Sequence, residues 1–257
     1  IQLSAAGSYR RSKEVRHDLD FVASSKHPEL VIEDFTHHTS VSEILAAGRL
    51  MGLDPHAFSV VGDCQSMPPV FLGLYDRPGR YWLPEGYADL QQSIDFFYGS
   101  FSHQSLTVQN GMSAASVLSP LWAEPGRCNP SETPLDCELR RNHPAALFIN
   151  LGMNWPEGNV PRHTDLVRQI VRVSIERGVL PILSTQADTS GEGGAINQGI
   201  AQVALDSDIP LWNSWRAVQH LPGHGIDVDR GAGYLTVEAW DARNFSALRA
   251  LHAILAE

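Results

Sequence analysis

Residues 57–66 read AFSVVGDCQS and combine an apolar run with a turn that carries a thiol. The apolar part, 57–62, predicts a buried strand, and Gly62 permits a tight turn directly after it. A helix or turn that starts there would aim backbone N–H groups at the Cys64 sulfur. A thiol in that position has a lowered pKa, and the thiolate is the form that attacks carbonyl groups. A single cysteine after a strand is also commonly a small buried apolar residue, so this segment alone leaves both interpretations open.

The rest of the chain alternates short apolar runs with segments of helical period. Further strands are predicted at 105–108, 146–152, 179–184 and 209–212, and helices at 40–53, 87–98, 164–177, 196–205 and 245–255. Nearly continuous apolar strands that alternate with helices indicate an α/β fold, with a five-stranded, mainly parallel sheet covered by helices on both faces. Such sheets carry their functional groups at the carboxyl ends of the strands.

The chain of 257 residues fits one large α/β domain. Residues 1–39 are harder to interpret, because 9–20 are rich in charge and 30–35 could form an edge strand or a packed arm. We therefore expect an N-terminal extension at 1–39 and a single domain at 40–257. The sequence begins at Ile1 without a Met or an apolar leader, which predicts a processed or trimmed product.

Composition excludes some classes of partner. Hydrophobic residues at 43% and charged residues at 19% are typical of a globular protein. The formal net charge of −10, without clustered Lys and Arg, argues against a nucleic-acid partner. No apolar run approaches the ~20 residues that a membrane-spanning helix needs. The pairs His37-His38 and His220/His224 are possible metal ligands, but Pro222 breaks the helix that would align the second pair, and we expect no metal site and no cofactor.

The three cysteines fall into a pair and a single residue. Cys128 and Cys137 bracket a segment with two prolines, which cannot be helical throughout and therefore contains a loop. A disulfide closing that loop would contribute roughly 2–3 kcal/mol in the chain-entropy model. The alternative is two unrelated buried thiols. A disulfide would indicate an oxidising compartment outside the cytoplasm and would leave Cys64 as the odd cysteine.

Three segments that follow predicted strands resemble the SGNH (GDSL-type) hydrolase family. Gly62-Asp63-Cys64 matches the family's Gly-Asp-Ser motif with Cys in place of Ser, Asn110-Gly111 matches the second motif, and 152–154 matches the Gly-x-Asn motif. The resemblance implies a flavodoxin-like three-layer sandwich with Cys64 as the nucleophile. It also implies that the Gly111 N–H and the Asn154 amide stabilise the oxyanion of acyl transfer, where the loss of one donor typically costs 10²–10³ in rate.

The resemblance extends to a group of secreted or envelope-associated bacterial proteins of that family, in which Cys at the nucleophile position looks natural. It rests on residues 54–65, 99–101, 128–138 and 211–225, and it covers most of the chain after about residue 40. It implies an extracytoplasmic protein.

The family's last motif, Asp-x-x-His before a Leu-Thr-like pair, is not matched. Alignment on Leu235-Thr236 places Tyr234 at the His position, and alignment on Asp229 places Ala232 there. His220 or His224, oriented by Asp227 or Asp229, could substitute as the base, or His224 could have only a structural role in its loop. A cysteine tolerates a missing base better than a serine does, because a few per cent of it is thiolate at pH 7.

Two functions remain open on this evidence. The first is an extracytoplasmic hydrolase of small acyl esters whose activity is weak or lost, with Gly62, Asp63, Tyr234 and Trp155 forming the turn and the pocket. The second is a non-catalytic cell-envelope protein on the same fold, which binds a glycan or a protein partner.

Overall fold

The computed structural model describes residues 39–153, 155, 157–188, 194–231 and 233–255. Its four strands form one parallel sheet in the order β1-β2-β3-β4. The strands are β1 (Asp54–Gly62), β2 (Pro144–Asn150), β3 (Leu180–Ser184) and β4 (Leu211–Trp212). Each lies where the apolar runs predicted it, and the α/β class with a parallel sheet is confirmed.

The prediction of a fifth strand at 105–108 is wrong, since the described sheet has four strands. Only Val108 pairs with β1, through an isolated parallel bridge to Gly62. The Ser105 hydroxyl bonds the side chain and the N–H of Thr107, and the Leu106 N–H donates to the Glu138 carboxylate. Short polar side chains that bond the nearby backbone compete in this way with a strand ladder. The segment therefore borders the free edge of β1 without extending the sheet.

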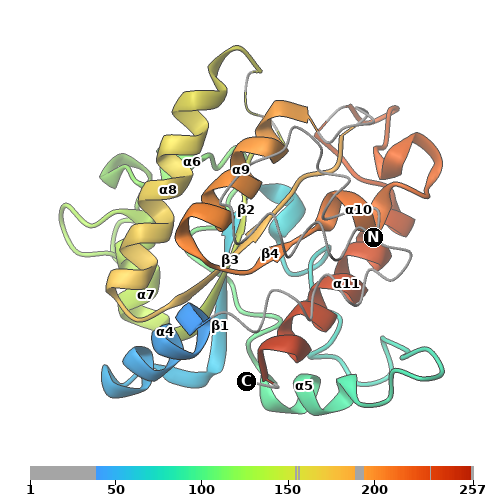
Figure 1. The fold of residues 1–257 in the computed structure, drawn as a ribbon, viewed down its shortest axis with the longest axis horizontal. Coiled ribbons are helices and arrows are strands. Elements are labelled where there is room, and N and C mark those ends of the chain that lie inside the picture. Colours follow the sequence, from blue (N-terminus) through green and yellow to red (C-terminus); the bar gives the residue numbers. More distant parts are fainter. Residues whose placement is uncertain (1–38, 154, 156, 189–193, 232, 256–257) are drawn as a thin grey trace.

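Helices cover both faces of the sheet (Figure 1). In that view α7 and α8 lie to the left of the strands, and α5 and α11 lie to the right. The described helices are α4 (Thr39–Leu50), α5 (Leu90–Phe96), α6 (Ala114–Val117), α7 (Pro134–Asn142), α8 (Val160–Glu176), α9 (Gly194–Ser207), α10 (Ser214–Val218) and α11 (Val237–Leu255). The predicted extension at 1–39 lies outside the described residues except for Thr39, where α4 begins.

Helix α7 was not predicted, and its first residue explains why it forms. Pro134 occupies the first turn, where a missing backbone N–H costs nothing. The Thr133 hydroxyl accepts from the Asp136 N–H, and the Asp136 carboxylate accepts from the Thr133 N–H. This capping box lets a helix start inside the Pro-containing segment.

The core on the α11 side of the sheet is aromatic. Phe148 of β2 packs edge-on against Phe58, Phe71 and Trp212, and all four side chains are at most 1% exposed. The indole N–H of Trp212 donates to Ser246 of α11 at 3.0 Å. The last helix is therefore fixed to the last strand.

Among the described residues, no helix combines the length and the apolar character that a membrane crossing requires.

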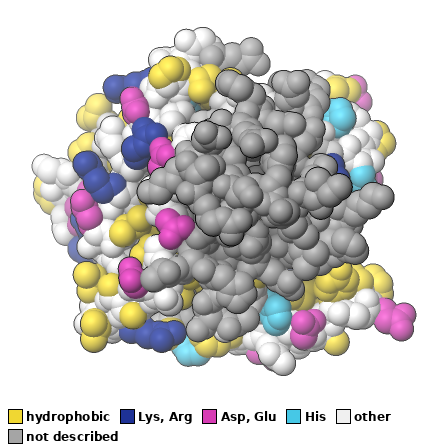
Figure 2. All heavy atoms as spheres, viewed as in Figure 1, with side chains coloured by type: hydrophobic (Ala, Val, Ile, Leu, Met, Phe, Trp, Pro, Cys, Tyr) yellow, Lys and Arg dark blue, Asp and Glu magenta, His cyan; other side chains and the backbone are white. Residues whose placement is uncertain are grey.

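Acidic and basic side chains alternate on the surface of α8. Figure 2 shows them interspersed on the left of the molecule, where α8 lies in Figure 1. Arg168 pairs with Asp165 and with Asp206 of α9, and Arg172 pairs with Glu176. Such paired charges do not form the continuous basic surface that binds phosphates.

Candidate functional site

The thiol of Cys64 lies just beyond the carboxyl end of β1. The strand ends at Gly62, and a short 3-10 helix, η1 (Cys64–Ser66), follows it. The Asp63 carboxylate accepts a 2.9 Å hydrogen bond from the Gln65 N–H and thereby caps η1. Cys64 is half-buried and carries a free thiol. Part of the Cys64 residue is therefore exposed at this edge of the sheet.

Only glycine fits at position 62. A Cβ there would lie 2.1 Å from the Ser66 hydroxyl oxygen and 3.0 Å from the Asn150 carbonyl oxygen. The hydroxyl of Ser66 and both amide atoms of Asn150 are buried and have no hydrogen-bond partner among the described residues. Buried polar atoms of this kind normally bond water or a ligand. The end of β1 is thus both tightly packed and incompletely hydrogen-bonded.

One side chain bonds the Cys64 sulfur in the part of the chain that the structure describes. The Gln65 amide nitrogen lies 3.7 Å from Sγ, and the Gln65 amide oxygen accepts a 2.9 Å hydrogen bond from the Trp240 indole N–H. Trp240 belongs to α11, which is distant in sequence. Sequence reasoning missed this contact, because no local pattern links residues so far apart.

A second residue of α11, Arg243, lies beneath the same turn. Its guanidinium donates to the Gln65 carbonyl at 3.1 Å and to the Ser214 hydroxyl at 3.2 Å. Burial lowers the pKa of Arg243 to about 10, although the nearby negative charge of Asp63 opposes that shift. The group remains a cation at neutral pH, so the turn contains a fixed positive charge.

Of the two predicted oxyanion donors, Gly111 belongs to the residues that the structure describes and Asn154 does not. Gly111 lies three residues after the bridge at Val108 and is exposed, with a left-handed φ of +77°. The segment before it is joined to β1, because the Gln109 N–H donates to the Gly62 carbonyl at 3.3 Å. Asn154 lies outside the described residues. Its neighbour Trp155 is half-buried and donates its indole N–H to the Asn159 carbonyl at 2.9 Å.

His163 of α8 is buried next to the loop that contains position 154. A Cβ on Gly152 would lie 3.3 Å from its Nε2, and its ring centroid lies 5.2 Å from that of Trp155. Within the part of the chain that the structure describes, neither ring nitrogen has a hydrogen-bond partner, and burial lowers the pKa of His163 to about 4. The sequence did carry a signal for this burial: His163 shares the helical spacing i, i+3, i+4, i+7 with buried residues of α8 (Leu166, Val167, Ile170).

The predicted site residues His224 and Tyr234 contact other residues of their own loop, 219–236. The His224 imidazole lies 3.3 Å from the Gln219 carbonyl oxygen, and the Arg230 guanidinium lies 4.5 Å from the centre of the Tyr234 ring. Asp229 is exposed. Across the described ranges, no hydrogen bond or ion pair joins His224, Asp229 or Tyr234 to Cys64. The loop instead packs on α11 through an apolar cluster of Ala187, Val218, Ile226, Leu235 and Ala239, with Trp240 at its margin.

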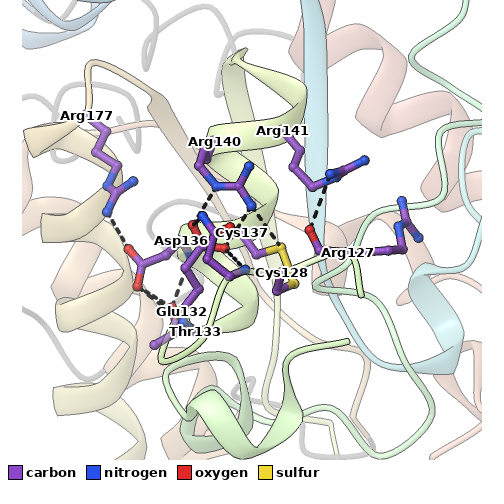
Figure 3. Close-up of polar contacts among 10 residues, drawn as sticks. Arg127, Cys128, Glu132, Thr133, Asp136, Cys137, Arg140, Arg141 and Arg177 are labelled. Carbon is purple, nitrogen blue, oxygen red and sulfur yellow. Dashed lines mark hydrogen bonds and ion pairs between the residues drawn. A yellow bond between two sulfur atoms is a disulfide. The ribbon is translucent and has the colours of Figure 1, made fainter. Parts of the chain in front are cut away.

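The predicted disulfide between Cys128 and Cys137 is confirmed (Figure 3), with Cα atoms 5.3 Å apart. Arg140 binds both carboxylate oxygens of Glu132, at 2.5 and 2.8 Å, and these bonds lower the pKa of Glu132 to about 2. The sulfur atoms and a Glu132 oxygen lie within 4.8 Å of one another, as metal ligands do. Two sulfurs bonded to each other are not thiolates, however, and thiolates are what would bind a metal.

The residue after Cys137 is a buried carboxylate that joins α7 to β1. Glu138 accepts hydrogen bonds from the Ser59 hydroxyl at 2.5 Å, the His103 Nε2 at 2.8 Å and the Leu106 N–H at 2.8 Å. Burial alone would raise the pKa of Glu138, but these bonds and the interaction with His103 together lower it. Glu138 is therefore a structural carboxylate, and sequence reasoning did not single it out.

No protein-family model, curated protein or solved structure matches this chain. The described geometry therefore defines its class: an α/β protein with a parallel sheet and a free thiol at the carboxyl end of β1. The disulfide lies elsewhere and joins Cys128, in the loop before α7, to Cys137 within α7.

Proposed function

We propose that this protein is an extracytoplasmic member of the SGNH (GDSL-type) hydrolase family with a flavodoxin-like sandwich fold. Cys64 would occupy the nucleophile position, and the activity on small acyl esters would be weak. The observation that carries this proposal is the free, half-buried thiol of Cys64, which follows β1 at the edge where α/β proteins bind their ligands. The strand order of the sheet and the bridge at Val108 are compatible with such a fold.

The proposed reaction begins when the Cys64 thiolate attacks the ester carbonyl carbon. A carbon–sulfur bond forms, the carbonyl π electrons move to oxygen, and the Gly111 N–H and the Asn154 amide stabilise that oxyanion. Collapse of the intermediate breaks the ester C–O bond, and the alcohol leaves with a proton taken from water. The hydroxide left by that proton transfer then attacks the thioester carbonyl carbon and the carbon–sulfur bond breaks, which releases the carboxylic acid and restores the Cys64 thiolate. Without a base for either proton transfer, both steps are slow.

The extracytoplasmic location rests on the disulfide between Cys128 and Cys137, because disulfides persist in oxidising compartments. The substrate we propose is a small acyl ester, including one carried on a cell-envelope glycan.

A second candidate function is non-catalytic binding of a glycan or a protein at the cell envelope. The observation that favours it is the position of His224, whose imidazole is next to a carbonyl of its own loop, while Asp229 is exposed. In that case the unpartnered polar atoms of Ser66 and Asn150 would contact a ligand instead of a reacting ester.

Hydrolysis of p-nitrophenyl acetate and butyrate by the purified chain separates the two candidates. We expect slow turnover beyond one equivalent of enzyme, abolished in Cys64→Ala and nearly abolished in Cys64→Ser, because a serine without a base keeps its proton. His224→Ala tests the substitute base, with His220→Ala as the matched exposed control in the same loop. Equal rates for the wild type and Cys64→Ala would reject the hydrolase proposal and leave the binding function.

A further inference from the structure

We infer that Gln65 and Trp240 form a positioning pair that holds the Cys64 sulfur and stabilises its thiolate in place of an imidazole. The inference rests on the proposed role of Cys64 as a nucleophile. It concerns how the Cys64 thiol is activated, since no bond from His224, Asp229 or Tyr234 reaches it in the described ranges.

The orientation of the Gln65 amide follows from Trp240. An indole N–H is only a donor, so the atom that accepts it at 2.9 Å must be the Gln65 amide oxygen. The amide –NH₂ group then faces the other way, and it lies 3.7 Å from Sγ. Gln65 therefore presents a donor, not an acceptor, to the sulfur.

The backbone of Gln65 is equally constrained. Its N–H donates to the Asp63 carboxylate at 2.9 Å, and its carbonyl accepts from the Arg243 guanidinium at 3.1 Å. The residue is only 5% exposed, so water does not compete effectively for these bonds. Both the backbone and the side chain of Gln65 are thus used to fix one amide N–H near one sulfur.

Independent evidence that this turn meets a ligand comes from its unpartnered polar atoms. The Ser66 hydroxyl, in the same 3-10 helix, and the side chain of Asn150, on the neighbouring strand, are at most 3% exposed and find no hydrogen-bond partner in the described ranges. A polar group of a substrate next to Cys64 would supply partners for such atoms.

The chemical consequence concerns the protonation of the thiol. A donor N–H stabilises a thiolate more than a thiol, because hydrogen bonds to charged groups are the stronger ones. A base would remove the proton during the reaction, whereas this pair would act by hydrogen-bonding the sulfur once it carries the negative charge. The result is a slow nucleophile that works without histidine.

The test measures the rate of Cys64 alkylation by iodoacetamide, by mass spectrometry, from neutral to alkaline pH. We expect Gln65→Leu to lower the rate at neutral pH by roughly three- to tenfold, as the loss of one hydrogen bond implies, and to leave the rate at alkaline pH nearly unchanged. Gln65→Glu keeps the acceptor for Trp240 but places a carboxylate at the sulfur, so the neutral rate should fall further. Trp240→Phe should give an intermediate loss, and Trp82→Phe, which removes an indole that is 79% exposed, should give none.

A merely structural role of Gln65 would change the alkylation rates equally at all pH values, and that result would overturn the inference. An unchanged pH profile in both Gln65→Leu and Trp240→Phe would overturn it as well. Circular dichroism identifies any variant that does not fold, and Trp240→Phe leaves the sequence of the turn itself unchanged. Because alkylation needs no ester turnover, its outcome is separate from that of the proposed function: a normal alkylation response without hydrolysis would reject only the latter.

Discussion

The Glu138 carboxylate and the His103 imidazole meet at 2.8 Å inside the protein, where Glu138 is 1% exposed. Because Ser59 and the Leu106 N–H donate to the same carboxylate, this contact joins α7, β1 and the segment that replaces a fifth strand. It connects the disulfide-bearing helix to the sheet, together with the hydrogen bond from the Asn142 amide to the Ser59 hydroxyl.

Glu138→Gln should destabilise the protein by about 1–3 kcal/mol at neutral pH, because an amide cannot accept from donors on both sides. The pKa of Glu138 is lowered in the folded protein, so its stabilising effect is present above the unfolded pKa of about 4.3 and is lost as the pH falls through the folded value. Urea unfolding from neutral to acid pH checks both points. Glu124→Gln, on the surface, is the control; a gap between wild type and Glu138→Gln that does not close in acid would contradict the prediction.

His163 should make the protein acid-sensitive. Its pKa falls from 6.5 to about 4 on burial, so the folded state favours the neutral ring. Stability should therefore fall as the pH drops from about 6.5 towards 4, by up to about 3 kcal/mol for the full shift. His163→Leu should remove this part of the pH dependence and, with no unpartnered ring nitrogens, be at least as stable at neutral pH. The exposed His220→Gln variant should follow the wild-type curve, and a curve for His163→Leu that also follows it would refute the prediction.

Removal of the disulfide should lower the free energy of unfolding by about 2–3 kcal/mol, since the cystine closes a short loop between positions nine apart in sequence. The double variant Cys128→Ser/Cys137→Ser tests this in denaturant unfolding, with Cys64→Ser as the control of unchanged stability. Without a reductant, iodoacetamide should label Cys64 alone. Labelling of Cys128 or Cys137 under those conditions would show that the bond is not formed.

The two glycines of the candidate site should respond differently to alanine. At Gly62 the new Cβ meets the Ser66 side chain and a carbonyl, so Gly62→Ala should cost about 1–3 kcal/mol by overpacking and also disturb alkylation of Cys64. At Gly111 the space is open, and only the left-handed φ opposes a side chain, which should cost about 1 kcal/mol. Thermal unfolding and alkylation rates measured together would show this order, and a larger cost at Gly111 would contradict it.

The local sequence pattern was sufficient to predict most strands of the sheet and the position of Cys64 directly after β1. The apolar runs of β1 to β4 predicted buried strands because burial on both faces requires continuous apolar sequence. The prediction of a strand at 105–108 was wrong, because the Ser105 hydroxyl bonds the side chain and the N–H of Thr107. Helix α7 was missed because two prolines masked a capping box at Thr133 and Asp136.

The contacts of the candidate site could not be predicted in the same way. The pairs that hold the Cys64 turn, Trp240 with Gln65 and Arg243 with Gln65, join residues 175 and 178 positions apart. Periodicity and turn chemistry report only on neighbours, and such pairs arise from the packing of the whole fold. The burial of His163, in contrast, follows from its helical spacing and was available from the sequence.

The dependence of the Cys64 turn on α11 also has a consequence for chains in which α11 has not yet been synthesised. Besides Trp240 and Arg243, Asn244 of α11 accepts from the Leu72 N–H, so the last helix supports the whole segment after η1. During synthesis, residues 64–72 leave the ribosome before α11 does. A nascent chain, or one truncated before α11, therefore holds Cys64 in a segment without these supports.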